Sequence, residues 1–136
     1  MKIIDTDIII DYLNGNDEAR LFIFSIPKKE RCITVITMME LLFGCRNKEE
    51  IRKVKKEIQV NFGEVVQCSE EASSKAVKLI ERYTKSHGLE LADSLIAGIV
   101  IVKEGVLYTG NVKDFRYIED LRIEGVTYKS SVVEEV

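Results

Sequence analysis

The sequence is poor in the residues that build zinc sites and disulfide frameworks. Its 136 residues include no tryptophan, one proline and one histidine, so the lone His87 supports no zinc site. The three cysteines, Cys32, Cys45 and Cys68, are odd in number, lie far apart and form no CxxC pair. Such spacing is typical of reduced thiols in a cytoplasmic protein.

An excess of charge of one sign and a long apolar run are also missing. The 23 acidic and 20 basic residues leave a net charge of -3, which argues against broad electrostatic binding to nucleic acid or to an anionic membrane. The longest apolar run, Leu95 to Val102, is far too short to cross a bilayer. A charge at Asp5 interrupts the N-terminus before a signal-peptide core could form. We therefore expect a soluble, cytoplasmic protein without membrane contact, in which any nucleic-acid contact is local.

What is present predicts one α/β domain over residues 1–136. Apolar residues make up 46% of the chain, and no linker, repeat or low-complexity tract divides it. Short β-rich runs alternate with longer stretches of helical period, and these runs are Lys2–Asp5, Cys32–Ile36, Val65–Cys68 and Val106–Thr109. The alternation is typical of a central, mostly parallel sheet of about four to five strands flanked by helices.

Three helices are predicted from apolar spacing and from end signals. Apolar residues recur every three to four positions from residue 51 to 62, and Gly63 follows as a stop. The same pattern runs from Ser69, as N-cap, to about His87, where Gly88 ends it. The segment from Leu91 to Val102 is apolar nearly all round, which indicates a buried helix.

Carboxylates interrupt these apolar segments near one edge of the predicted sheet. Asp5 ends the first strand, and Asp93 lies in the first turn of the buried helix. In a parallel sheet, the carboxyl ends of strands and the N-termini of helices gather on one edge, where ligands usually bind. The polar residues that could reach this edge are Asp5, Asp7, Glu40, Asp93, Asn111 and Asp114.

Such a cluster needs a compensating charge. Carboxylates held together in a partly buried crevice repel one another and lose hydration, which is unfavourable unless protons or a cation compensate. A divalent ion is the simplest compensation, and all-oxygen ligands favour Mg2+ or Mn2+ over zinc. The cluster suits phosphodiester cleavage, in which the metal activates water and neutralises charge on the phosphate.

Each carboxylate also has a structural interpretation. Asp7 is expected to cap the helix that follows the first strand. Thr37-Met-Met-Glu40 fits a capping box, so spacing alone leaves a cap and a metal ligand equally open for Glu40. The helix dipole favours Asp93 near its helix start, although the apolar surroundings favour a functional role. Asp11 is expected on a solvated helix face.

Several sequence blocks occur in order along the chain: MKIIDTDIIIDYL, ITVITMMELLFG, LELADSLIAGIVI, LYTGNVKDFRYI and LRIEGV. Together they resemble the PIN domain, and specifically the VapC-type toxin ribonucleases of prokaryotic toxin–antitoxin pairs. The resemblance runs from Met1 to about Tyr128, which is almost the whole chain.

The resemblance implies an endoribonuclease that hydrolyses RNA phosphodiesters with Mg2+ or Mn2+. It implies that Asp5, Glu40 and Asp93 are catalytic metal ligands. The fourth acidic position is open, because it falls either on Asn111, which supplies no negative charge, or on Asp114. We assign Asp114 to the catalytic and metal-binding set and Asn111 to a supporting role.

Further implications concern neighbouring residues and partners. Thr6 and Thr109 match polar positions beside the metals, where they order water or phosphate, and Asp7 is a supporting or capping residue. Members of this family also pair with a small antitoxin protein that covers or enters the cleft, and they commonly form homodimers.

Two other functions stay open. DTD after a β-strand also resembles the haloacid-dehalogenase phosphatases, in which the first aspartate is a nucleophile, but that family leaves the TMMELLFG and LADSLIAG blocks unexplained. The other is a degenerate PIN module that binds RNA or a protein without cutting it. Asn111 is the one feature that favours this alternative.

Overall fold

The computed structural model describes residues 1–128 of the chain. Within them lies one five-stranded sheet in the order β3-β2-β1-β4-β5, and every pair of neighbouring strands is parallel. The strands are β1 (Lys2–Ile4), β2 (Arg31–Thr34), β3 (Glu64–Val66), β4 (Val106–Thr109) and β5 (Ile123–Gly125). The predicted α/β fold with a parallel central sheet is confirmed.

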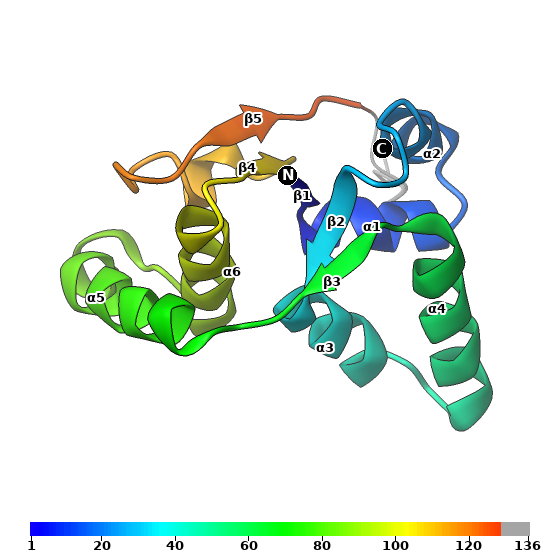
Figure 1. The fold of residues 1–136 in the computed structure, drawn as a ribbon, viewed down its shortest axis with the longest axis horizontal. Coiled ribbons are helices and arrows are strands. Elements are labelled where there is room, and N and C mark those ends of the chain that lie inside the picture. Colours follow the sequence, from blue (N-terminus) through cyan, green and yellow to red (C-terminus); the bar gives the residue numbers. More distant parts are fainter. Residues whose placement is uncertain (129–136) are drawn as a thin grey trace, which may run out of the picture.

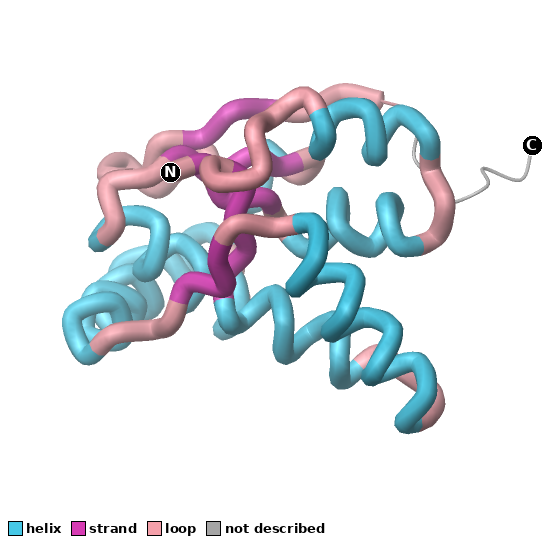
Figure 2. Tube along the Cα trace, turned by 45° about the vertical axis from the view of Figure 1, so that its right-hand side comes forward, coloured by secondary structure: helices cyan, strands magenta, loops and turns pink. Residues whose placement is uncertain are grey.

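Helices cover both faces of this sheet. The helices of the described residues are α1 (Thr6–Leu13), α2 (Asp17–Phe24), α3 (Val35–Phe43), α4 (Lys48–Asn61), α5 (Glu70–His87) and α6 (Leu91–Val102), with a short 3-10 turn, η1 (Val112–Asp114). Helices α5 and α6 lie on one side of the sheet, and α1, α2 and α4 lie on the other (Figure 1). Figure 2 shows the strands running between these two groups of helices.

The sheet separates two apolar cores. Alternate residues of a strand point to opposite faces, so Ile3 joins the core formed with α5 and α6, whereas Ile4 joins the core formed with α1, α2 and α4. On β2, Cys32 and Ile33 divide in the same way. Burial on both faces explains why the strands appear in the sequence as continuous apolar runs rather than as alternating ones.

Helix ends match the predictions where the end signals are local. The Ser69 side chain caps α5 by accepting a hydrogen bond from Ala72 N, and Gly88 ends that helix with φ at 73°. Helix α6 spans the predicted range Leu91–Val102. Helix α4 starts earlier than expected because the side chain of Asn47 caps it at Glu50 N.

The prediction that Asp11 lies on a solvated face is wrong. Asp11 is only 8% exposed, and its Oδ2 accepts a hydrogen bond of 2.7 Å from the Tyr128 hydroxyl. Val126 and Tyr128, which follow β5, pack against the core that contains α1. The segment after the last strand therefore covers a helix face that is polar in the sequence of α1.

Two expectations about the chain's environment can be compared with the structure. Cys32, Cys45 and Cys68 are free thiols, as predicted. Of the helices formed by residues 1–128, none combines the length and the apolar character that a membrane crossing needs.

Candidate active site

The carboxyl ends of β1 and β4 bring together residues that are far apart in the sequence. Asp5 follows β1 directly, and Thr109 ends β4, its parallel neighbour. The Thr109 hydroxyl donates a hydrogen bond of 2.7 Å to Asp5 Oδ2. Asp5 is only 5% exposed. The strand pairing therefore holds a buried carboxylate at the edge of the sheet where a ligand site is predicted.

Asp5, rather than Asp7, is the N-cap of α1. The backbone of Asp5 is extended, and its Oδ1 accepts a hydrogen bond of 2.8 Å from Thr6 N. Asp7 lies within the first turn of the helix. The capping role predicted for Asp7 is therefore wrong, because β1 ends at Ile4 and the next residue takes the cap position.

Asp7 is held by the turn that follows β4. Asn111 Nδ2 donates a hydrogen bond of 3.2 Å to Asp7 Oδ2, and Asn111 N donates one of 2.9 Å to the Thr109 hydroxyl. A side chain at Gly110 would place its Cβ 2.8 Å from Asp7 Oδ2, so a larger residue there would displace the Asp7 carboxylate. Asp7 Oδ1 is buried and has no hydrogen-bond partner among the described residues. This oxygen is therefore available to accept a proton or to bind a cation.

Glu40 reaches the same edge from α3, but it is not part of a capping box. The N-cap of α3 is Thr34, whose hydroxyl accepts a hydrogen bond of 3.1 Å from Thr37 N. Glu40 lies deeper in the helix, and its Oε1 accepts a hydrogen bond of 2.8 Å from the Thr6 hydroxyl. The predicted cap fails because β2 ends at Thr34, two residues before the expected Ile36, so α3 begins earlier.

The carboxyl groups at this edge lose hydration and repel one another. Burial, and next the negative charge of Asp7, raises the pKa of Asp5 from 3.8 to about 7. Burial also raises the pKa of Asp7. The Thr109 hydroxyl and the Thr6 N–H act in the opposite direction, since they stabilise the Asp5 carboxylate. Without positive charge nearby, Asp5 therefore keeps its proton to a much higher pH than an exposed aspartate does.

Asp93 interacts with this group through its charge, and no hydrogen bond links its side chain to another of the described residues. Burial, and next the charge of Asp114, raises the pKa of Asp93 from 3.8 to about 6. Glu90, Glu40 and Asp7 add smaller effects of the same sign. Sequence reasoning missed Glu90, which is the N-cap residue of α6 and lies close enough to influence Asp93. Its position directly before the buried helix is the signal that could have identified it.

The donors of this edge fit a hard divalent cation. As the side chains stand in residues 1–128, no three Asp, Glu, His or Cys residues form a group that could hold a metal ion. The chemistry nevertheless suits Mg2+ or Mn2+, because every candidate donor is an oxygen and Asp7 Oδ1 is buried without a partner. The raised pKa values of Asp5 and Asp93 indicate the same unmet need for positive charge.

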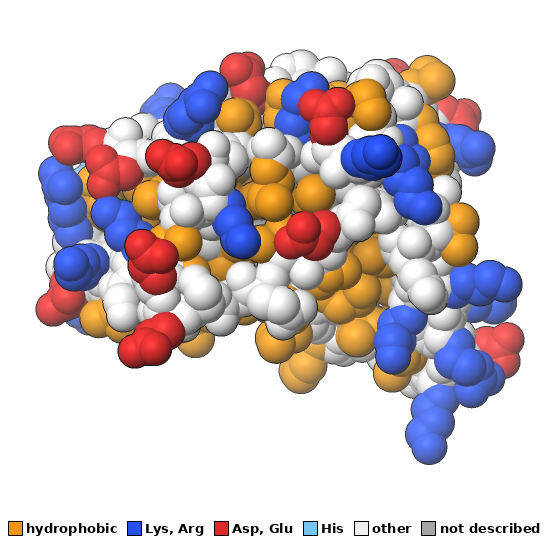
Figure 3. Space-filling model, viewed as in Figure 1, with side chains coloured by type: hydrophobic (Ala, Val, Ile, Leu, Met, Phe, Trp, Pro, Cys, Tyr) orange, Lys and Arg blue, Asp and Glu red, His pale blue; other side chains and the backbone are white. Residues whose placement is uncertain are grey.

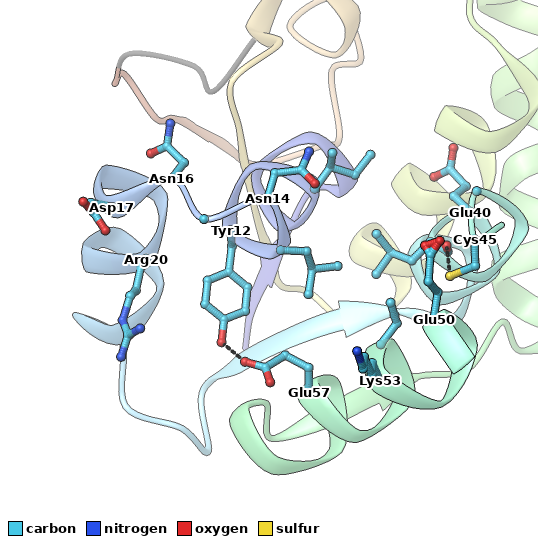
Figure 4. Close-up of a pocket in the computed structure, with 16 residues that line it drawn as sticks. Tyr12, Asn14, Asn16, Asp17, Arg20, Glu40, Cys45, Glu50, Lys53 and Glu57 are labelled. Carbon is cyan, nitrogen blue, oxygen red and sulfur yellow. Dashed lines mark hydrogen bonds between the residues drawn. The ribbon is translucent and has the colours of Figure 1, made fainter. Parts of the chain in front are cut away.

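A pocket of about 670 Å³ adjoins the acidic edge and shares Glu40 with it. Residues of α1, α2, α3 and α4 line the pocket, as Figure 4 shows. Its lining combines apolar side chains such as Leu13 and Val54 with charged ones such as Arg20 and Lys53. The Tyr12 hydroxyl donates a hydrogen bond to Glu57 across the pocket wall.

The fold and the acidic edge define a PIN domain. The sequence model described as the PIN domain matches residues 2–119, and the chain belongs to the PIN domain family. This match spans the TMMELLFG and LADSLIAG blocks, so the phosphatase alternative is set aside.

The similar proteins carry VapC and VapBC names. Ribonuclease VapC19 from Mycobacterium tuberculosis is 32% identical to the chain over 127 residues, which cover 90% of the chain and 98% of that protein. The structure of VapBC-1 from nontypeable Haemophilus influenzae is 27% identical, with a TM-score of 0.73 and coverage of 91% and 96%. The structure of DNA-bound VapBC from Salmonella typhimurium is 25% identical, with a TM-score of 0.76 and coverage of 91% and 96%. The resemblance to VapC-type PIN domains is confirmed.

Proposed function

We propose that the chain is a divalent-metal-dependent endoribonuclease and the toxin of a toxin–antitoxin pair. The observation that carries this proposal is the pair of the buried Asp5 and the half-buried Asp7, which Thr109 and Asn111 hold at the carboxyl edge of a PIN fold. One oxygen of this pair has no partner among the described residues, and burial raises both pKa values. The ribonuclease names of the relatives support the same reaction class.

In this proposal Asp5, Glu40, Asp93 and Asp114 hold the Mg2+ or Mn2+ ion. When bound, such an ion makes water a better nucleophile and neutralises charge on the phosphate. The protein's own contribution is to fix the carboxylates before RNA arrives: Thr109 orients Asp5, and Thr6 orients Glu40. Hydrogen bonds of this kind fix the orientation of a ligand and tune its basicity.

Asp114 is the better candidate for the fourth acidic position. The Asn111 amide is turned toward Asp7, to which it donates a hydrogen bond, so it acts as a support for another carboxylate. Asp114 lies in η1 and is the charged residue with the largest effect on Asp93. A carboxylate at this place supplies the negative charge that Asn111 lacks.

The proposed protein partner is a small antitoxin that occupies the pocket between α1, α2, α3 and α4. The pocket is large enough for several side chains of a peptide, and Glu40 is one of the residues that line it. A segment lying there would therefore reach the acidic edge. The similar structures from Haemophilus influenzae and Salmonella typhimurium are VapBC assemblies, which supports a partner of this kind.

A homodimer is the proposed assembly, with α3 in its interface. Phe43, near the end of α3, is 94% exposed, and Met39 lies one turn earlier and is exposed as well. Hydrophobic side chains gather over α3 on the face shown in Figure 3. Leu91, at the start of the neighbouring α6, is a third large exposed apolar residue. Burial of these side chains against a second copy would remove them from water.

The proposed function is tested by incubating the antitoxin-free protein with cellular RNA in Mg2+ or Mn2+. We expect discrete fragments that disappear with EDTA and with Asp5→Asn, because both remove the proposed metal. RNA binding without cleavage by the parent protein would instead support the degenerate, non-cutting PIN module. The proposal places the reaction in the cytoplasm, where the RNA substrate and the reduced cysteines would both be found.

A further inference from the structure

Two aromatic rings from distant parts of the sequence form a face-to-face stack. The ring centroids of His87 and Tyr117 lie 4.4 Å apart, and the ring planes differ by only 11°. His87 is the last residue of α5 and is exposed, and Tyr117 follows η1 and is partly exposed. An exposed stack of this kind contributes little to the core, so its location is informative.

Tyr83 supports this stack from the side. Its ring centroid lies 5.6 Å from His87 and 5.2 Å from Tyr117, at interplanar angles of 73° and 62°. A ring on the far side of His87 would lie much farther from Tyr117 than that. Tyr83 therefore lies beside the pair. Among the described residues, Tyr117 stacks on one face of the His87 ring, and neither tyrosine covers the opposite face.

The stack lies at the rim of the acidic site. Residues 88–90 join α5 to α6, so a short connection leads from His87 to Asp93 in the first turn of α6. On the other side, Tyr117 closely follows Asp114 in the chain. Burial raises the pKa of Tyr117, and the charges of Asp93 and Asp114 add to this rise. The tyrosine hydroxyl is thus within electrostatic reach of both carboxylates.

Several hydrogen bonds fix the stack in place. The Ser86 hydroxyl lies 2.7 Å from His87 Nδ1, and the Thr84 hydroxyl donates to Leu89 O at 2.9 Å, which ties down the turn after α5. Arg82 in α5 pairs with Glu119 at 3.1 Å, just beyond Tyr117. These contacts restrain the segments that carry the two rings, and restraint before a ligand binds lowers the entropy cost of binding.

We propose that the stacked His87–Tyr117 pair is a base-binding platform, on which a base of single-stranded RNA next to the cleaved phosphodiester stacks. The inference rests on the proposed ribonuclease function and names residues that contact its substrate. Unpaired RNA bases stack on aromatic side chains, and such stacking tolerates any base while still contributing to affinity. The outer face of His87 supplies the flat, exposed surface that this mode of binding requires.

The test is a comparison of RNA affinities in the Asp5→Asn background, where cleavage does not consume the probe. The probe is a short, fluorescently labelled single-stranded RNA of random sequence, and binding is measured by anisotropy. We expect His87→Ala to weaken binding about tenfold, as loss of one base stack does. His87→Phe keeps a flat ring and should bind like its parent, as should the control Ser74→Ala on the exposed face of the same helix. Unfolding temperatures of all variants are measured alongside.

A second measurement needs no substitution at the platform. The same background protein is photo-crosslinked to RNA that contains iodouridine, and the crosslinked peptides are identified by mass spectrometry. Crosslinks at His87 or Tyr117 support the platform. Unchanged affinity of His87→Ala, equal weakening by His87→Phe, or crosslinks confined to other segments would each overturn it.

The platform and the ribonuclease proposal fail in distinguishable ways. If the parent protein cleaves RNA in a metal-dependent manner but His87→Ala cuts the same sites at the same rate, only the platform is wrong. If the parent protein neither binds nor cleaves RNA, the proposed function is wrong and the platform falls with it.

Discussion

The Thr109 hydroxyl donates to Asp5 Oδ2 at 2.7 Å and accepts from Asn111 N at 2.9 Å. One side chain at the end of β4 therefore fixes both the carboxylate that follows β1 and the turn that holds Asp7. The first of these hydrogen bonds joins residues 104 positions apart in the sequence. We regard this link as the feature that shapes the acidic site.

Replacing Thr109 by valine keeps the shape of the side chain and removes both hydrogen bonds. Because the hydroxyl lowers the pKa of Asp5, Thr109→Val should raise it and weaken metal binding. We expect RNA cleavage to fall by about 10- to 100-fold, the usual effect of losing a partner of a metal ligand. Cleavage rates measured over a range of Mg2+ concentrations test this. Thr109→Ser should restore most of the activity, and a valine variant as active as the parent would contradict the assigned role.

The stability of the metal-free protein should depend on pH in a direction set by Asp5 and Asp93. Burial raises their pKa values to about 7 and about 6, so between about pH 4 and these values the folded protein keeps protons that the unfolded chain has released. This contribution to stability is full below the unfolded value of 3.8 and is lost as the pH rises through the folded values. For Asp5, we expect a loss of about 2 kcal/mol between pH 5 and pH 7.

Urea unfolding of the metal-free protein at several pH values measures this loss. Asp5→Asn removes the titrating group and should flatten the profile while making the protein more stable at pH 7 than its parent. Mg2+ should stabilise the parent more at pH 7 than at pH 5, since protons compete with the metal for the carboxylates. A profile that Asp5→Asn leaves unchanged would show that another group causes the pH dependence.

Helices α5 and α6 should tolerate no side chain at Gly98. A Cβ there would lie 2.6 Å from Ala72 O and 3.2 Å from Ala76 N, both atoms of the α5 backbone. Gly98→Ala should therefore force the helices apart and cost about 1–3 kcal/mol of unfolding free energy. Gly44→Ala is the matched control, because a Cβ there meets its nearest atoms at 3.6 Å, an ordinary contact distance. Equal unfolding midpoints for the two variants would argue against this close helix packing.

The contact between Tyr128 and Asp11 should contribute measurably to stability. Burial, and next the hydrogen bond to Asp11, raises the pKa of Tyr128, so the hydroxyl stays protonated and able to donate at neutral pH. Tyr128→Phe should cost about 1–2 kcal/mol, because Asp11 is buried and loses a donor. Asp11→Asn keeps an acceptor oxygen and should cost less. Thermal unfolding compares the two variants. An unfolding temperature that Tyr128→Phe leaves unchanged would show that the hydrogen bond to Asp11 does not contribute to stability.

The sequence predicts those features whose signals are local. The Ser69 cap and Gly88 stop of α5 and the apolar range of α6 depend on neighbouring residues only, and all are found as expected. The alternation of β-rich and helical stretches predicts the parallel sheet. By contrast, the position of the edge strand β5 depends on its pairing with β4, and its own residues do not predict it.

The errors arise where tertiary contacts decide. Asp11 is polar on an amphipathic helix, but it is buried in the fold, where the distant Tyr128 donates a hydrogen bond to it. The N-cap of α1 is Asp5, the first residue after β1, and the N-cap of α3 is Thr34, the last residue of β2. An error in the predicted length of a strand therefore displaces the predicted cap. Glu90 precedes the buried helix in the sequence, and its influence on Asp93 becomes evident once the position of α6 beside the other carboxylates is known.

The most direct test of the proposed metal site is a calorimetric titration of the metal-free protein with Mn2+. We predict binding with release of protons near pH 6.5, because Asp5 and Asp93 hold protons that the cation displaces. Asp5→Asn should abolish binding, whereas the exposed Asp120→Asn, whose carboxylate pairs with Lys75, should bind as the parent does. Absence of Mn2+ binding by the parent protein, or unchanged binding by Asp5→Asn, would contradict a metal site built on this acidic edge.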